Sequence, residues 1–309
     1  MSLELVAQGL QFPEGPVALS DGSVLLVEIR RKTLTRVTAD GQVSIVADVG
    51  GGPNGLAIGP DCAVYIANNG GPEWRQRPDG MFVSAGLGAA YEGGSIQRVD
   101  LGSGTVTTIY TACDGRKLRW PNDLVFDSTG GFWFTDSGTK AVNGQMELGQ
   151  IFYARPDGSE ITRVREGMIV PNGIGLSADE RTLYVAETLT SRLWAFDVIR
   201  PGVLAPPDDI YAAERRDKVL GPLSGFQMLD SLAVEADGKI CVGTLVNGGI
   251  TIFDPASDEI GHLPLPDRMV TNICFGGPDM RDAWITAAGT GRLYKCRWPR
   301  PGLKLRYNV

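Results

Sequence analysis

The chain repeats one pattern of apolar and polar positions six times. In each repeat a short apolar run leads to a turn, and a second run rich in Val, Tyr, Phe or Trp follows. The repeats begin at residues 13, 53, 121, 171, 229 and 271 and read PEGPVALSDGSVLLVE, PNGLAIGPDCAVYIAN, PNDLVFDSTGGFWFTD, PNGIGLSADERTLYVAE, LDSLAVEADGKICVGT and TNICFGGPDMRDAWITA. Alternation with a period of two on both sides of a tight turn predicts two β-strands joined as a hairpin.

Further strands are predicted after these hairpins. Third strands are expected at 34–37, 96–99, 151–153, 193–196, 250–253 and 293–295, and outer strands at 43–46 and 105–108. Six four-stranded units predict an all-β, six-bladed β-propeller around a central channel, a fold that protects its sheet edges by closing a ring. Two segments compete to close that ring, because residues 3–10 and residues 303–307 both fit an outer strand.

Length, composition and charge narrow the class of protein. A chain of 309 residues often forms two domains, but propellers of this size are single units, and no linker divides the sequence. Residues 1–309 are therefore expected to form one domain. The net charge of −7 disfavours nucleic acid as a partner. The sequence contains no run that predicts a membrane span or a signal peptide, so a cytoplasmic protein is expected.

The cysteines and the histidine exclude some kinds of site. The five cysteines have no metal-site spacing and leave one unpaired, which argues against a disulfide framework. The chain has one histidine, His262, in a segment between outer strands and far from the expected channel mouth. A Ser-His-Asp or Cys-His mechanism is therefore not expected.

Each repeat carries a polar residue at its start. We interpret these starts, such as Pro53-Asn54-Gly55, as turns that precede the first strand of each blade, where the blades converge on the channel. The six residues are Glu14, Asn54, Asn122, Asn172, Asp230 and Asn272. Asn-Gly and Asn-Asp are also ordinary turn dipeptides, so any single one is explained by local structure.

The set as a whole favours a metal site. Its members keep one register although the glycine that follows is absent from three repeats, and two members are carboxylates that would repel each other in a narrow channel. A divalent cation would resolve that repulsion. Carboxylate and amide oxygens suit calcium first, with magnesium and manganese as alternatives. Zinc is also possible, although it normally binds imidazole or thiolate, which this ring does not supply.

The repeat starts carry a family resemblance over essentially the whole chain. The run FPEGP, with PND, PNG and LDS opening later repeats, resembles the gluconolactonase family, which includes senescence marker protein and luciferin-regenerating enzyme and is similar in design to diisopropyl fluorophosphatase. The resemblance implies a six-bladed propeller with one catalytic divalent metal ion at the channel mouth. It implies Glu14, Asn172 and Asp230 as metal ligands, and Asn122 as a ligand to the metal or its bound substrate. Arg119 resembles an arginine that contacts substrate oxygens in some members.

The residues themselves indicate the chemistry. A metal ion with open positions polarises a substrate carbonyl and stabilises the oxyanion that forms on attack. Asp230 is the candidate general base for an attacking water, or alternatively a nucleophile that forms a covalent intermediate.

Other residues are expected to line the substrate pocket. They are Trp120, Asn54, Asn272 and Met228, together with Asn122 and Arg119. Two insertions, residues 69–94 and residues 220–229, are candidate lids near the mouth, and surface connections without substrate contact are the alternative.

Three functions remain open at this point. The leading hypothesis is a metal-dependent lactonase that opens a sugar-derived or related hydroxy-acid lactone. A metal-dependent phosphotriesterase would use the same site on a phosphoryl oxygen. The third is a calcium-stabilised binding or regulatory propeller without catalysis. The expected partner is a small-molecule lactone, and the oligomeric state leaves no trace in the sequence.

Overall fold

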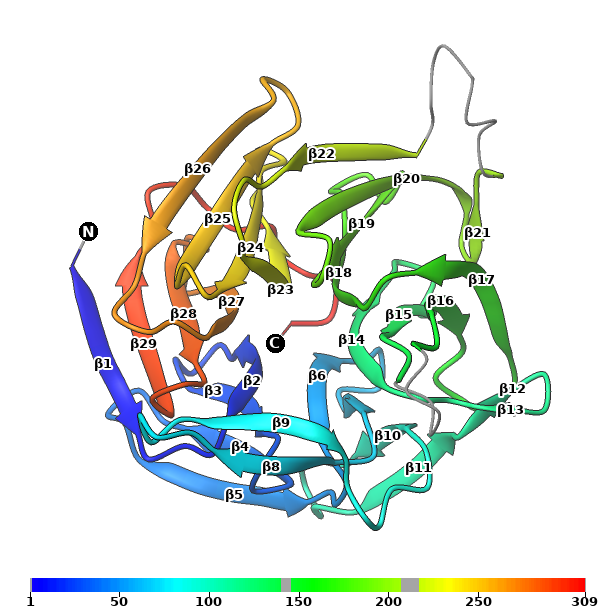
Figure 1. Cartoon of the computed structure of the whole chain (residues 1–309), viewed down its shortest axis with the longest axis horizontal. Helices are drawn as coiled ribbons and strands as arrows, with labels where there is room; N and C mark the ends of the chain where they lie inside the picture. The colour runs from blue at the N-terminus through cyan, green and yellow to red at the C-terminus, as the bar shows by residue number, and fades with distance from the viewer. Residues whose placement is uncertain (1, 140–145, 207–216, 309) are drawn as a thin grey trace.

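Six antiparallel sheets surround a central channel in the structure, a computed structural model that describes residues 2–139, 146–206 and 217–308 (Figure 1). The described residues contain no helix, and thus none with the length and hydropathy that a membrane span needs. This arrangement confirms the predicted six-bladed β-propeller. His262 lies in an outermost strand, where its ring hydrogen-bonds Thr251 and Asn247, as expected for a residue outside the site. All five cysteines are free, as expected.

Each sheet is one blade, and its strands run outward from the channel. The first three blades are β2 (Pro13–Ala18), β3 (Val24–Glu28), β4 (Thr33–Val37), β5 (Val43–Asp48); β6 (Pro53–Ile58), β7 (Val64–Asn68), β10 (Ser95–Val99), β11 (Val106–Tyr110); and β14 (Pro121–Phe126), β15 (Phe132–Asp136), β16 (Gly149–Ala154), β17 (Ile161–Met168). Two small hairpins lie outside the blades: β8 (Pro72–Gln76) with β9 (Phe82–Leu87), and β12 (Ala112–Cys113) with β13 (Arg116–Lys117).

The other three blades complete the ring. They are β18 (Pro171–Leu176), β19 (Thr182–Glu187), β20 (Arg192–Arg200), β21 (Val203–Leu204), β22 (Lys218–Pro222); β23 (Met228–Val234), β24 (Ile240–Leu245), β25 (Gly249–Asp254), β26 (Glu259–Pro264); and β27 (Val270–Gly276), β28 (Asp282–Ala287), β29 (Arg292–Arg297), β1 (Leu3–Gln8). In the fourth blade, β21 and β22 both pair with β20. The predicted third strands are confirmed in every blade.

The amino-terminal strand closes the ring. Strand β1 pairs antiparallel with β29, so that Leu3 lies opposite Cys296 and Gln8 lies opposite Arg292. Of the two segments that the sequence left open, residues 3–10 therefore supply the last outer strand. Because the chain's first strand completes the sheet of its last blade, the hydrogen bonds of that sheet hold the ring shut.

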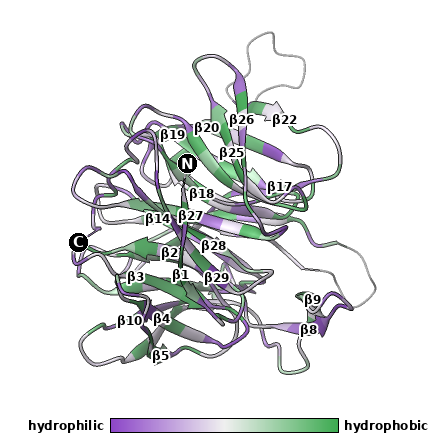
Figure 2. Cartoon of the chain, turned by 90° about the vertical axis from the view of Figure 1, so that its left-hand side faces the viewer, coloured by the Kyte–Doolittle hydropathy of each residue, from purple (hydrophilic) through white to green (hydrophobic). Residues whose placement is uncertain are grey.

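Aromatic and aliphatic side chains fill the space between blades, and Figure 2 shows their apolar strands in the interior. Between the second and third blades, the ring of Phe134 stacks on that of Phe152 with centroids 4.9 Å apart. Trp133 and Trp284 are buried, as predicted, whereas Trp194 is only partly buried and stacks on Phe196. Burial of each such side chain contributes roughly 1.5–3 kcal/mol to folding.

The innermost strands contact one another in a closed circle, in the order β2, β6, β14, β18, β23, β27 and back to β2. Glycines permit this close approach. A Cβ atom on Gly55 would lie 2.6 Å from Asp123 Cα, and one on Gly173 would lie 2.7 Å from Leu232 N. The prediction that these motifs are turns ahead of the strand is wrong, because Pro-Asn-Gly forms the first residues of the inner strand itself. Its glycine makes room for the neighbouring blade.

The carboxyl-terminal residues run inward to the centre of the ring (Figure 1), on the face away from the β8–β9 hairpin (Figure 2). The backbone N–H of Leu303 donates to the carbonyl of Val234 at 2.8 Å. Leu303, Leu305 and Asn308 line one end of a channel cavity of about 80 Å³, whose other end is lined by Asp123. Residues 303–307 therefore plug the channel instead of adding a strand to a blade.

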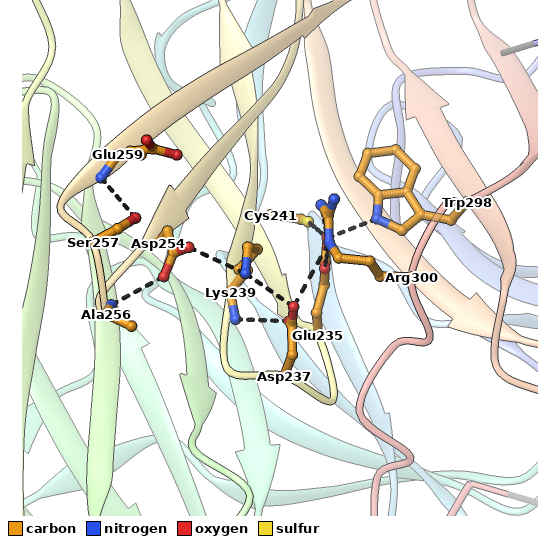
Figure 3. Close-up of polar contacts among 10 residues, drawn as sticks. All are labelled: Glu235, Asp237, Lys239, Cys241, Asp254, Ala256, Ser257, Glu259, Trp298 and Arg300. Atoms are coloured by element: carbon orange, nitrogen blue, oxygen red, sulfur yellow. Dashed lines mark hydrogen bonds and ion pairs between the residues drawn. The ribbon is translucent and has the colours of Figure 1, made fainter.

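A buried carboxylate anchors this tail (Figure 3). The side chain of Glu235 is fully buried and accepts hydrogen bonds from Trp298 Nε1 at 2.7 Å and from Arg300 Nη2 at 2.8 Å. Cys241 Sγ donates to the same carboxylate at 3.1 Å, and burial raises the pKa of that thiol. Glu235 thus joins the fifth blade to the segment that leads into the plug.

We predict that Glu235→Gln destabilises the protein by about 2–3 kcal/mol, because it removes the buried counter-charge of the Arg300 guanidinium and leaves only the more distant Asp237 carboxylate, 3.9 Å away, near it among the described residues. Urea unfolding measures the change. Asp237→Asn is the matched control, since Asp237 also faces Lys239 and Arg300 but is 41% exposed, and its loss is expected to cost less than about 1 kcal/mol. Equal effects of the two variants would contradict an anchoring role for Glu235.

Candidate functional site

The start of each inner strand lies at one mouth of the channel. Strand pairing places Pro13 opposite Glu28, Pro121 opposite Asp136 and Pro171 opposite Glu187, at the end of the second strand of each blade. The loops that enter the inner strands and the loops that leave the second strands therefore share this face. The β8–β9 hairpin leaves the second blade on this side, opposite to the carboxyl-terminal tail (Figure 2).

Polar side chains at the ends of four second strands hold the entry loops in place. We call these buried side chains the latch residues: Glu28, Asn68, Asp136 and Glu187. They accept backbone N–H groups two or three residues ahead of the polar ring position: Gln11 at 2.6 Å, Gly52 at 2.8 Å, Arg119 at 2.7 Å with Trp120 at 2.8 Å, and Ile169 at 2.7 Å. Each latch satisfies buried backbone donors and fixes where the next inner strand starts.

An irregular register occurs in every inner strand at or beside the polar ring position. The shifts lie between Glu14 and Val17, Pro53 and Leu56, Pro121 and Leu124, Pro171 and Ile174, Leu229 and Leu232, and Val270 and Asn272. A bulge adds a residue that the neighbouring strand does not pair, and it re-aims the side chain beside it. The repeated irregularity therefore lets consecutive residues such as Asn122 and Asp123 both be buried at the channel.

All six predicted ring residues are buried. Their exposed fractions lie between 2% for Glu14 and 9% for Asp230. Glu14 Oε2 accepts a hydrogen bond from Asn272 Nδ2 at 2.8 Å, which joins the first and last inner strands. Asn172 hydrogen-bonds Asp230, and its Nδ2 donates to Thr188 Oγ1 at 3.1 Å. The structure thus brings Glu14, Asp230, Asn172 and Asn272 into one connected group.

Two oxygens at this site have no hydrogen-bond partner among the described residues. They are Glu14 Oε1 and Asn122 Oδ1, and both are fully buried. A buried acceptor without a partner costs free energy that a folded protein normally avoids. Both atoms belong to residues at the same end of the channel. A cation or hydrogen-bond donors at this end would therefore satisfy both of them.

Three acidic side chains lie at this end of the channel. Burial and the charge of Asp230 raise the pKa of Glu14 well above its usual value. Burial raises the pKa of Asp230 to about 7, and the charge of Asp123 acts in the same direction. Burial also raises the pKa of Asp123 to about 7. Without a cation these groups resist ionisation together, because each is removed from water and faces another acid.

Asp123 was missed in the sequence, although it stands beside Asn122 in the motif PND. Its Oδ1 accepts the N–H of Leu124 at 2.9 Å, and its side chain also hydrogen-bonds Ser231. Asp123 therefore adds negative charge below the ring while its own hydrogen bonds hold it in place.

The residues present fit a hard divalent cation. The donor atoms are carboxylate and amide oxygens, two of which lack other partners, and calcium and magnesium prefer such donors. No group of three or more His, Cys, Asp or Glu side chains forms a metal site within the described ranges. A cation here would therefore depend on asparagine oxygens as well as on Glu14 and Asp230.

Two residues predicted to contact substrate lie on the entry loop of the third blade. Arg119 forms an ion pair with Glu147, with Nη1 2.9 Å from Oε2, so its guanidinium already has a counter-charge. The ring of Trp120 lies 6.1 Å from that of Tyr91, whose hydroxyl donates to the carbonyl of Arg119. Trp120 is half-buried and held in position from two sides.

The other two predicted pocket residues differ in their contacts. Asn54 is buried on β6. Met228 is half-buried at the start of β23, opposite Leu245 and two residues ahead of Asp230. The insertion that precedes it forms β22 and a loop whose Gln227 carbonyl accepts a hydrogen bond from Ser191.

The first insertion, residues 69–94, forms the β8–β9 hairpin, which docks on the first blade. The ring of Trp74 lies 4.9 Å from that of Phe12, two residues before Glu14. The Arg30 guanidinium lies 3.9 Å from the centre of the Phe82 ring. An aromatic pair and a cation–π contact thus hold the hairpin against the first blade, on the same face as the mouth.

Comparison with known proteins gives this arrangement a family. Residues 12–289 match the family described as the SMP-30/gluconolactonase/LRE-like region. A gluconolactonase from Zymomonas mobilis is 25% identical over 297 residues, which cover 89% of this chain and 76% of that protein.

Solved structures share the fold. A gluconolactonase from Xanthomonas campestris aligns with a TM-score of 0.73 at 23% identity, over 96% of this chain and 89% of the other. Regucalcin from Agrobacterium tumefaciens, described as a calcium-binding protein, aligns with a TM-score of 0.72 at 17% identity, over 98% of both chains. At these identities the likeness concerns the fold alone.

We predict that Glu14→Gln abolishes stabilisation of the protein by calcium. With calcium at 100 times its dissociation constant, the unmodified protein should gain about 2.7 kcal/mol, and the variant should gain none because a charged ligand is lost. Thermal unfolding with chelator and with calcium measures both. Glu73→Gln, the same change at an exposed glutamate on β8, should leave the gain intact. A full calcium response in Glu14→Gln would exclude Glu14 as a ligand.

Proposed function

The chain belongs to the SMP-30/gluconolactonase/LRE-like family, and from this premise we propose that it is a metal-dependent hydrolase that opens lactones. The observation that carries the proposal is the pair of partnerless oxygens, Glu14 Oε1 and Asn122 Oδ1, beside crowded buried acids. Lactone hydrolysis is supported by the gluconolactonases among its relatives. The proposed substrate class is a sugar-derived or related hydroxy-acid lactone.

The proposed metal ligands are Glu14, Asn122, Asn172 and Asp230. Calcium is the proposed ion, since the donors are all oxygens and a calcium-binding protein shares the fold. When bound, the ion would polarise the lactone carbonyl and stabilise negative charge on its oxygen.

Asp230 is the residue proposed to move the proton. Its carboxylate oxygen would take a proton from a water molecule as that water's oxygen bonds to the lactone carbonyl carbon. The ring C–O bond then breaks, and the proton passes to the departing ring oxygen, which becomes a hydroxyl group. The hydrogen bond with Asn172 favours the ionised carboxylate that this role requires.

Asp230 has a second possible role in the same reaction. As a nucleophile, one of its oxygens would bond to the carbonyl carbon while the ring C–O bond breaks, and water would then attack the carboxyl carbon of Asp230, so that the acid leaves with an Asp230 oxygen. The two roles differ in which oxygen enters the product during the first turnover.

The metal requirement is tested by hydrolysis of a lactone panel with chelated protein, before and after addition of calcium, magnesium, manganese or zinc. The panel holds aldonolactones and aliphatic and aromatic lactones, and acid release at constant pH is the readout. Activity should vanish with chelator and return with calcium. Turnover of an organophosphate triester alone would replace the proposal with a phosphotriesterase, and metal-dependent stability without any turnover would replace it with a binding protein.

Asp230→Asn should lower kcat by about 10²–10⁴-fold on the best lactone found, because the amide cannot accept the proton. Asp61→Asn, which changes an acid paired with Arg98 in the turn between β6 and β7, at the end of β6 away from Asn54, should keep full activity. Single turnover in ¹⁸O-labelled water separates the two roles: a general base leaves the label in the product, and a nucleophile leaves it in Asp230. Full activity of Asp230→Asn would remove Asp230 from the mechanism.

A further inference from the structure

A cleft of about 500 Å³ opens between the β8–β9 hairpin and two loops of the third blade. Arg75, Gly86 and Leu87 line it on the hairpin side, and Trp120 and Thr139 line it on the other. Sites for small molecules typically occupy roughly 300–1,000 Å³, so the cleft has room for a sugar-sized ligand. Trp120 is two residues from Asn122, so the cleft borders the ring.

Both walls of the cleft are held in place. On the hairpin, Trp74 packs on Phe12, and because side chains alternate along a strand, the next residue, Arg75, projects from the other face. On the opposite wall, the Asp136 carboxylate accepts the N–H groups of Trp120 at 2.8 Å and of Gly138 at 3.0 Å. A pocket whose walls are already fixed loses little freedom when a ligand binds.

The charge of Arg75 is not compensated within the described residues. Arg77, on the same hairpin, pairs with Asp79 at 3.3 Å, and Arg119 pairs with Glu147 at 2.9 Å, but no carboxylate of the described chain lies within ion-pair distance of Arg75. A guanidinium presents a planar set of donors that matches a carboxylate, so Arg75 is equipped to bind an anionic group in the cleft.

We propose that Arg75 binds a free carboxylate of the substrate, so that the preferred substrates are lactones of dicarboxylic sugar acids; this rests on the lactone hydrolysis proposed above. Arg75, whose charge has no carboxylate partner among the described residues, attracts that carboxylate to the outer wall of the cleft. The substrate therefore enters with its carboxylate toward Arg75 and its lactone carbonyl toward Asn122. The face of Trp120 packs on the C–H face of the sugar ring between them.

The test compares two lactones that differ at one carbon. D-glucaro-1,4-lactone carries a carboxylate where D-glucono-1,4-lactone carries a hydroxymethyl group. The calcium-loaded protein should favour the carboxylated lactone in kcat/KM. Arg75→Ala should raise KM for that lactone about 10- to 100-fold with kcat unchanged, and should leave the neutral lactone unaffected. Arg75→Lys should restore part of the loss because it keeps the charge.

Arg77→Ala is the matched control, since it removes an equal charge from the same hairpin, and it should change neither substrate's KM. Equal losses on the two lactones, or the same effect from Arg77→Ala, would overturn the role of Arg75.

A binding measurement distinguishes failure of the lactonase proposal from failure of the proposed role of Arg75. If no lactone is hydrolysed, calorimetric titration with the dicarboxylate D-glucarate still tests the cleft, because Arg75→Ala should weaken that binding about 10- to 100-fold. Binding that does not depend on Arg75 would overturn the inference whether or not the protein is an enzyme.

Discussion

The close approach of six inner strands around one axis is the constraint on which the rest of the structure depends. At Gly15, Gly55 and Gly173 a side chain would collide with the backbone of the next blade. Residues without a Cβ atom therefore stand directly after ring residues in three blades, and the neighbouring first strands can touch there. The contact that closes the propeller is thus made beside the atoms that form the site, so folding and placement of Glu14, Asn54 and Asn172 are one event.

That geometry also buries acidic side chains close to one another, which is unfavourable unless they find partners. Strands that converge bring Glu14, Asp123 and Asp230 into a buried region, where burial raises the pKa of each carboxyl. Glu235 shows the alternative, since its equally buried carboxylate has Arg300 and Trp298 as partners. A buried carboxylate is thus fully hydrogen-bonded just after the fifth blade's inner strand, whereas Glu14, at the start of the first blade's inner strand, keeps one oxygen without a partner among the described residues. The contrast supports the proposed site at the mouth of the channel.

Local pattern predicted the blades, the strand order and the shared position of the six ring residues at the starts of the inner strands, because these follow from periodicity and from a register repeated along the chain. It did not decide between residues 3–10 and 303–307, since both alternate alike and only pairing with β29 separates them. It misassigned Pro53-Asn54-Gly55 as a turn, because the need for glycine comes from Asp123 in the next blade. The pattern did not identify Asp123 as a site residue, because strand alternation assigns adjacent residues to opposite faces. The bulge lets both Asn122 and Asp123 be buried at the channel.

The latch residues show what a closer reading of the repeats would find. Glu28, Asn68, Asp136 and Glu187 end four of the repeats, where a strand leaving the core commonly becomes polar. Their burial and their bonds to the entry loops show instead that they set the starting position of the ring residues. Asp136 has a second effect, because the N–H groups that it accepts belong to Arg119, Trp120 and Gly138, which border the cleft. One carboxylate therefore links the position of Asn122 to the shape of the cleft beside it, so the third blade joins the proposed catalytic site to the proposed substrate cleft.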